Sequence, residues 1–185
     1  SMFHLFTHAM FKALLFLGAG SVIHAVHSNY LKDMGGLRKH MKVTNITFLI
    51  AALAISGVFP LSGFWSKDEI LVAAFEHDKL LYFVGLFVAG LTAFYMFRIY
   101  FGIFWGKERD YKHTPHESPL SMTFPLVVLA FLSITAGFIP FSDYVSADKA
   151  GFEMHLNYPL AGVAVLVGLL GIAFAWAFYK KENDL

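Results

Sequence analysis

The chain has 185 residues, of which 57% are hydrophobic and only 15% are charged, and its net charge is +1. Soluble domains carry about 25% charged residues, so this composition, with a mean hydropathy of +0.60, predicts a membrane protein. The small net charge, with the basic residues in short loops, argues against nucleic acid as a partner. The absence of cysteine excludes disulfides and cysteine-ligated iron–sulfur clusters.

Apolar segments along the chain predict an all-α polytopic membrane protein with about five transmembrane helices, because each span needs about 20 mostly apolar residues. The expected spans are 1–27, 43–76, 80–105, 122–139 and 158–180. They are joined by loops at 28–42 and 106–121 on one side of the membrane and at 140–157 on the other. No signal-peptide pattern opens the chain. It begins inside an apolar segment, so we expect it to be a piece of a longer polypeptide.

The first span contains an unusual set of ionisable residues. His4, His8 and Lys12 follow one another at four-residue spacing and therefore share one stripe of a helix. Lys12 lies about 15 Å into the span, near the middle of the membrane, where an ionisable side chain usually marks an ion or proton path. The alternative is a lysine whose amine reaches the membrane surface. His24 is about 120° from Lys12 around the helix and would join such a path only through a bend, a water or a neighbouring helix.

The second span is interrupted by Gly57, Pro60 and Gly63, which are poor residues for a continuous helix. Broken helices of this kind commonly mark ion sites in transporters. After the break, the sequence from Ser66 to Glu69 predicts a capping box with Ser66 as the N-cap. An alternative is that residues 43–59 form a complete short span followed by a surface helix.

Lys67 would then lie in the first turn of the second half-helix. Burial and the positive end of the helix dipole favour its neutral amine, whereas the adjacent Asp68 and Glu69 favour the ammonium. Opposed influences of this kind leave a lysine able to change its protonation state when a neighbouring charge moves.

Basic residues are concentrated on one side of the predicted membrane. Ten of the 14 lie in or beside the first and third loops and the C-terminus: Lys32, Arg38, Lys39, Lys42, Arg98, Lys107, Arg109, Lys112, Lys180 and Lys181. The positive-inside rule places these loops and the C-terminus in the cytoplasm. Trp105, Tyr111, Trp176 and Tyr179 would form an aromatic belt on that side.

The sequence contains no nucleophile elbow, phosphate-binding loop, dinucleotide fingerprint or metalloprotease motif. His113 and His116 form a pair in the third loop without the further ligands that a zinc site needs. We therefore predict neither a catalytic residue nor a metal site on this chain.

Three segments carry a resemblance to a known family. They are the run from His4 to His24 (HLFTHAMFKALLFLGAGSVIH), the loop from Asp33 to Lys39 (DMGGLRK) and the segment from Pro60 to Leu71 (PLSGFWSKDEIL). In this order they resemble the distal antiporter-like membrane subunits, of the subunit L type, of bacterial respiratory complex I, the NADH–quinone oxidoreductase. The resemblance covers roughly residues 3–71 and corresponds to the C-terminal part of that family.

The resemblance implies part of an antiporter-like inverted-repeat fold that relays protons through buried residues. Lys12 would be the central lysine, His4 and His8 its relay partners, and Lys67 with Asp68 the charged pair of the broken helix. His24 occupies a position where the family carries a polar residue.

The family also implies that this chain carries no cofactor and performs no redox chemistry itself. NADH, FMN, iron–sulfur clusters and quinone would be bound by partner subunits of the enzyme. The expected partners are other membrane subunits of complex I, chiefly the neighbouring antiporter-like subunit, and the lipid bilayer. The expected location is the bacterial inner membrane, with the C-terminus in the cytoplasm. Two alternatives remain at this point: a subunit of a cation–proton antiporter complex, and a static assembly scaffold.

Overall fold

The computed structural model describes residues 2–111, 113–139 and 157–180, and within these ranges its regular structure is entirely helical. The main helices are α1 (Met2–Val26), α2 (Lys42–Ser56), α3 (Ser62–His77), α4 (Lys79–Phe104), α5 (Leu120–Thr135) and α7 (Tyr158–Tyr179). Short 3-10 helices lie between α1 and α2 and directly after α5. The all-α expectation is confirmed. The predicted outer loop at 140–157 lies, except for Asn157, outside the described residues.

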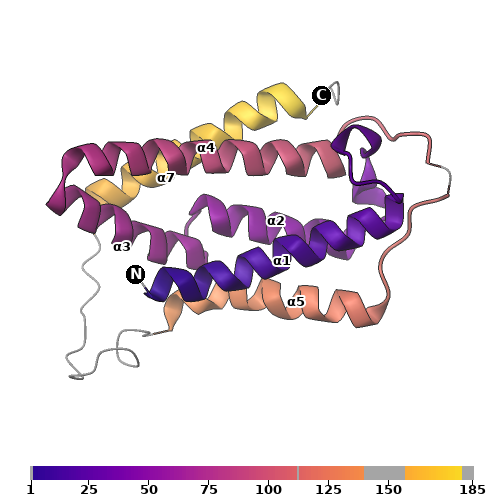
Figure 1. Cartoon of the computed structure of the whole chain (residues 1–185), viewed down its shortest axis with the longest axis horizontal. Coiled ribbons are helices and arrows are strands. Elements are labelled where there is room, and N and C mark those ends of the chain that lie inside the picture. The colour runs from indigo at the N-terminus through magenta and orange to yellow at the C-terminus, as the bar shows by residue number, and fades with distance from the viewer. Residues whose placement is uncertain (1, 112, 140–156, 181–185) are drawn as a thin grey trace.

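The helices run along one common direction and form layers (Figure 1). The helices α4 and α7 pack against each other along one side of the molecule, and α5 lies on the opposite side. Between them, α1 packs on both α2 and α5, while α3 contacts α1, α2 and α4. The first halves of α1 and α3 therefore contact each other, as the hydrogen bonds of His4 and Thr7 with Ser66 show.

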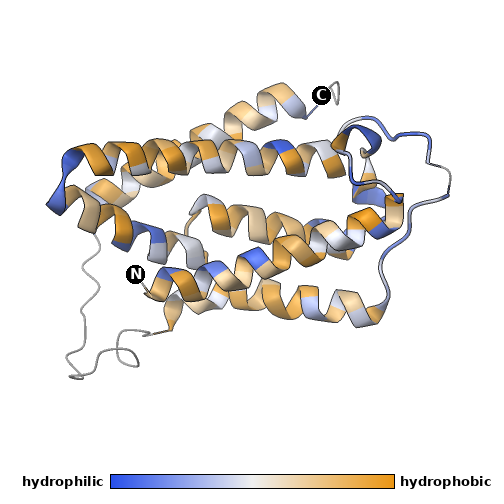
Figure 2. Cartoon of the chain, viewed as in Figure 1, coloured by the Kyte–Doolittle hydropathy of each residue, from blue (hydrophilic) through white to orange (hydrophobic). Residues whose placement is uncertain are grey.

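Hydrophobic residues make up most of each long helix (Figure 2). Among the described residues, four helical segments are long and apolar enough to cross a membrane: Met2–Val26, Lys79–Phe104, Leu120–Phe138 and Tyr158–Tyr179. Large apolar side chains such as Phe87, Leu166 and Phe174 point outward from α4 and α7, as expected of helices that face lipid. Hydrophilic segments gather at the ends of the bundle and on parts of α1 and α3 (Figure 2).

The second expected span, 43–76, corresponds to two shorter helices, α2 and α3. The 15 residues of α2 are about 22 Å long, which is short of the ~30 Å apolar core of a membrane. It ends at Ser56, and Gly57 follows in the left-handed conformation with φ of 76°. The chain then turns, and α3 continues beyond the end of α2 along the bundle (Figure 1). That these two helices act as one broken span remains a prediction.

The predicted capping box at Ser66 is wrong. Helix α3 begins four residues earlier, at Ser62, and its N-cap Leu61 provides no side-chain hydrogen bond. Ser66 therefore lies inside the helix, where its hydroxyl is fully buried. The pattern of a serine followed three residues later by a glutamate looks the same inside a helix as at its start.

Gly63 allows α2 and α3 to approach closely at the break. A Cβ atom at this position would lie 1.9 Å from the backbone oxygen of Ala54, a distance that no packing adjustment of side chains can relieve. The glycine is therefore required by the contact between two backbones rather than by an unusual φ angle.

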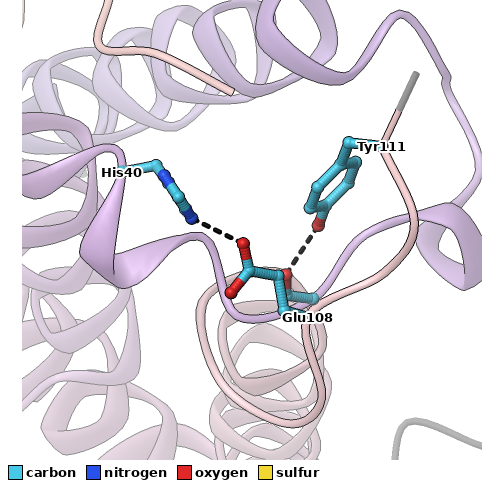
Figure 3. Close-up of polar contacts among 4 residues, drawn as sticks. His40, Glu108 and Tyr111 are labelled. Carbon is cyan, nitrogen blue, oxygen red and sulfur yellow. Dashed lines mark hydrogen bonds and ion pairs between the residues drawn. The ribbon is translucent and has the colours of Figure 1, made fainter. Parts of the chain in front are cut away.

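Two loops meet at the end of the bundle that carries most of the basic residues. The His40 side chain contacts the Glu108 carboxylate at 2.7 Å, and the Tyr111 hydroxyl donates to the Gly35 carbonyl at 2.6 Å (Figure 3). Burial raises the pKa of Tyr111, so this hydroxyl remains a donor at neutral pH. These two contacts hold the loop after α4 against the loop before α2.

Glu117 provides the N-terminal cap of α2 from a distant part of the chain. Its carboxylate accepts hydrogen bonds from the backbone N–H of Val43 (2.7 Å) and of Thr44 (3.3 Å), and from the Thr44 hydroxyl (2.6 Å). The local N-cap residue, Met41, makes no side-chain cap. A carboxylate at this end also interacts favourably with the helix dipole.

We predict that Gly63→Ala destabilises the protein by at least about 1–3 kcal/mol, because the added methyl group overpacks a backbone contact. Gly20→Ala is the matched control, since a Cβ there meets nothing within 4 Å. It should leave stability unchanged or raise it through the better helix propensity of alanine. The measurement is the thermal unfolding midpoint in detergent. Equal midpoints for the two variants would contradict the role assigned to Gly63.

Glu117→Ala should cost about 1–2 kcal/mol of stability, the usual cost of losing a helix cap. Glu108→Ala removes another carboxylate from the same loop. The ion pair of Glu108 with His40 is largely exposed, so this substitution should lower stability by less than about 1 kcal/mol. Chemical denaturation of the two variants in detergent compares these costs. A larger loss for Glu108→Ala would overturn the assignment.

Candidate functional site: an open cavity beside the helix break

An open cavity of about 300 Å³ lies between α1, α3 and α4 and reaches the end of α2 at Ile55. Its walls are mainly apolar, with six polar or ionisable side chains among them: His4, His8 and Lys12 from α1, Lys67 from α3, and Thr92 and Tyr95 from α4. Four of the predicted site residues are therefore brought to one space by two different helices, α1 and α3.

The three residues from α1 reach the cavity because of their helical spacing. Side chains four residues apart lie one above the other on a helix, and the rings of His4 and His8 are 5.7 Å apart between centroids. Lys12 follows one turn further along the same stripe and is half-buried. This succession gives a row of proton-accepting and proton-donating groups along the cavity wall.

Lys67 reaches the cavity from the opposite side of the break. Its Nζ donates a hydrogen bond to the backbone carbonyl of Ile55 at 2.9 Å. That carbonyl belongs to the last turn of α2, where carbonyl groups lack intrahelical partners and the helix dipole is negative. Lys67 is the sixth residue of α3 rather than a first-turn residue, so the expected placement against the positive end of α3 is wrong. The amine instead faces the negative end of α2.

Asp68 lies beside a separate, smaller space. Its side chain is only 5% exposed, and within the described ranges its Oδ1 atom has no hydrogen-bond partner. The space has a volume of about 10 Å³ and is lined by both Lys67 and Asp68, together with Ser56 and Gly57. A volume of this size accommodates about one water molecule. Lys67 is therefore the residue common to both spaces.

His24 lies apart from the cavity, near the other end of α1. Its exposed ring contacts the rings of His27 and His116, with centroid separations of 6.1 and 6.4 Å. Twelve residues separate it from Lys12, about 18 Å along the helix. The structure thus groups His24 with loop histidines, and its part in a proton path stays a prediction. Across the described residues, no three histidine, aspartate or glutamate side chains form a group that could hold a metal ion.

Thr92 and Tyr95 were not singled out by the sequence. They lie three residues apart in an apolar span and so share one face of α4. This spacing is the one feature of the sequence that could have pointed to them. The Thr92 hydroxyl donates to the Val88 carbonyl of its own helix at 2.7 Å. Threonine and tyrosine are common in apolar spans, so only the position of α4 opposite α1 identifies them as cavity residues.

An all-helical bundle with half-buried lysine and histidine side chains on one cavity has the features of an antiporter-like membrane protein. Residues 1–94 match the family model described as "NADH:quinone oxidoreductase/Mrp antiporter, TM". The chain belongs to this family.

Curated relatives agree along almost the whole chain. It is 42% identical to NAD(P)H-quinone oxidoreductase chain 5 of Picosynechococcus sp., with 98% of this chain and 34% of the relative covered. It is 41% identical to the chloroplastic subunit 5 of Chaetosphaeridium globosum, with 99% and 32% covered. It is 40% identical to NADH-quinone oxidoreductase subunit L of Rickettsia bellii, with 98% and 31% covered. The chain therefore spans about a third of the length of these relatives.

If the cavity holds water, a cysteine at Tyr95 should react with a small water-soluble thiol reagent, because the reactive thiolate needs a polar environment. The chain has no native cysteine, so Tyr95→Cys in the chain reconstituted in lipid nanodiscs gives an unambiguous signal. Ala93→Cys, at a fully buried position, and Leu91→Cys, on an outward apolar face, are the controls. We expect labelling of Tyr95→Cys to be at least about tenfold faster than that of either control. Similar rates at all three positions would contradict a hydrated cavity.

Proposed function

We propose that this chain is part of a proton-translocating membrane subunit of an NADH–quinone oxidoreductase. One observation carries the proposal: two lysines from different helices and two histidines line one open cavity, in a chain of the NADH:quinone oxidoreductase/Mrp antiporter family. Ionisable side chains inside a membrane are costly to bury, and their usual role is to conduct ions or protons.

In this proposal, His4, His8 and Lys12 relay protons along α1, and Lys67 exchanges protons with them across the cavity. The contact between Lys67 and the Ile55 carbonyl supports a cationic form of this lysine in the observed arrangement. Asp68, next to Lys67 and beside its own small space, would continue the path, and His24 would lie toward its cytoplasmic end. Directional transport requires that a lysine loses its proton when a neighbouring charge changes.

The break between α2 and α3 would keep this path inside a single span. Gly57, Pro60 and Gly63 interrupt the helix, and irregular backbone at membrane depth is tolerated where it lies inside protein or lines a wet cavity. Gly57 in its left-handed conformation also lies against the Lys67 side chain. The interruption would thus supply both the free carbonyl and the space that Lys67 needs.

The remaining parts of the enzyme would come from other chains. The names of the relatives indicate NAD(P)H or NADH and quinone as substrates of the complexes to which those relatives belong. NADH, FMN, iron–sulfur clusters and quinone would be bound by partner subunits, and redox chemistry there would drive charge movement here. The expected neighbours are the other complex I membrane subunits, chiefly an antiporter-like one, in the bacterial inner membrane.

We infer that the two loops joined by hydrogen bonds, and the C-terminus, would face the cytoplasm. The described basic residues at this end include Arg38, Arg98 and Lys180, which lie 4.0–5.4 Å from the ring centroids of Trp105, Trp176 or Tyr179. Aromatic rings paired with cations suit the boundary between lipid and cytoplasm. The loops at 28–42 and 106–121 would be cytoplasmic, and 140–157 would face the other side.

Lys12→Ala, in the complete complex, should lower the number of protons pumped per NADH oxidised, because the central group of the relay is lost. The measurement uses inverted membrane vesicles with assembly checked on native gels. Lys39→Ala, in the exposed cytoplasmic loop, is the control and should pump normally. Normal pumping by a fully assembled Lys12→Ala complex would refute the proposal. Failure to assemble would instead favour a static scaffold role for this lysine.

A further inference from the structure

Two hydroxyl groups outside the proposed relay connect α1 to α3 beside the cavity. The Thr7 hydroxyl donates to the Ser66 hydroxyl with an Oγ1–Oγ distance of 2.8 Å. The Nδ1 atom of His4 lies 3.0 Å from the same Ser66 oxygen. Thr7 and Ser66 are both fully buried. The His4 ring, which lines the cavity, therefore contacts the Ser66 hydroxyl of α3, and that hydroxyl is in turn bonded by the Thr7 hydroxyl of α1.

We propose that Thr7 and Ser66 are positioning residues that keep the His4 ring in place through changes of its protonation state. The inference rests on the proposed function, because it matters only if His4 exchanges protons. It adds two residues to the site that carry no charge themselves.

The chemistry of a hydroxyl group explains how one contact can serve every form of the ring. When Nδ1 carries a proton, Ser66 Oγ accepts hydrogen bonds from His4 and Thr7 and donates its own proton to the Ser62 carbonyl, 3.3 Å away. When Nδ1 is unprotonated, Ser66 Oγ turns its proton toward His4 and still accepts from Thr7. Only the hydroxyl protons rotate between the two arrangements, and the heavy atoms stay where they are. Nδ1 thus has a partner in both neutral tautomers and in the imidazolium.

The same contact links His4 to Lys67 through the backbone. Ser66 and Lys67 are neighbours in α3, so the hydroxyl that holds the histidine and the amine that binds the Ile55 carbonyl move with one turn of one helix. A displacement of α3 would therefore change the position of His4 and of Lys67 together. The described titratable groups that line the cavity together with His4 are His8, Lys12, Lys67 and Tyr95.

The test compares isosteric variants in the complete complex. Thr7→Val keeps the shape of the side chain and removes the hydroxyl, Thr7→Ser keeps the hydroxyl, and Ser66→Ala removes the other partner. Thr47→Val is the matched control, because the buried Thr47 hydroxyl bonds only to carbonyls of its own helix, those of Val43 and Thr44. The measurement is the initial rate of NADH-driven proton uptake per assembled complex across a pH series in inverted vesicles.

We expect Thr7→Val and Ser66→Ala to slow proton uptake about two- to tenfold, the factor that one hydrogen bond represents, and to shift its pH profile. Thr7→Ser should restore both the rate and the profile, and Thr47→Val should leave them unchanged. A normal rate and profile in Thr7→Val would overturn the inference, as would equal losses in Thr7→Val and Thr7→Ser. Lys12→Ala in the same membranes separates the two claims. If it pumps normally, the proposed function fails, whereas if it fails to pump and Thr7→Val is normal, only the positioning role fails.

Discussion

The backbone carbonyls at the end of α2 must find hydrogen-bond donors inside an apolar bundle, and the arrangement around the cavity follows from how they do so. A carbonyl left without a donor in such surroundings costs a few kcal/mol. The backbone N–H of Gly57 donates hydrogen bonds to the carbonyls of Leu53 and Ala54, and the N–H of Val58 also donates to the carbonyl of Leu53. The carbonyl of Ile55 accepts its hydrogen bond from a side chain, the amine of Lys67. A lysine is thereby drawn to the helix break, where the local dipole favours a cation.

This constraint connects the backbone to the proposed chemistry. Lys67 can reach Ile55 only because Gly63 lets α3 lie directly on the last turn of α2. The same placement brings Ser66 against α1, where it meets His4 and Thr7. Loss or gain of a proton at Lys67 would alter its bond to the carbonyl, and the effect would reach His4 through a single turn of α3. Coupling between distant charges requires an element that has two alternative arrangements. In this account the element would be the turn of α3 that carries Ser66 and Lys67, with the bond from Lys67 to the Ile55 carbonyl made or lost.

Local features of this protein could be predicted from its sequence, whereas contacts between distant segments could not. The common stripe of His4, His8 and Lys12 follows from the period of a helix, and Gly57 and Gly63 mark the interruption directly. The capping box at Ser66 was a wrong prediction because the same pattern occurs within a helix. The Glu117 cap joins residues 73 or more positions apart, and Tyr95 enters the cavity only because α4 packs against α3. The Glu117 cap has no local signature, and the spacing of Thr92 and Tyr95 does not by itself identify them as cavity residues.

The most direct test of one continuous path is a double-mutant comparison of Lys12→Ala, Lys67→Ala and the two together, measured as protons pumped per NADH oxidised by the assembled complex. Groups that act in a single path are not additive, since the path fails once either is lost. The account predicts that the double variant pumps no less than the more impaired single variant. A clearly greater loss in the double variant, equal to the two single losses combined, would show that the lysines act independently and would contradict a shared cavity path.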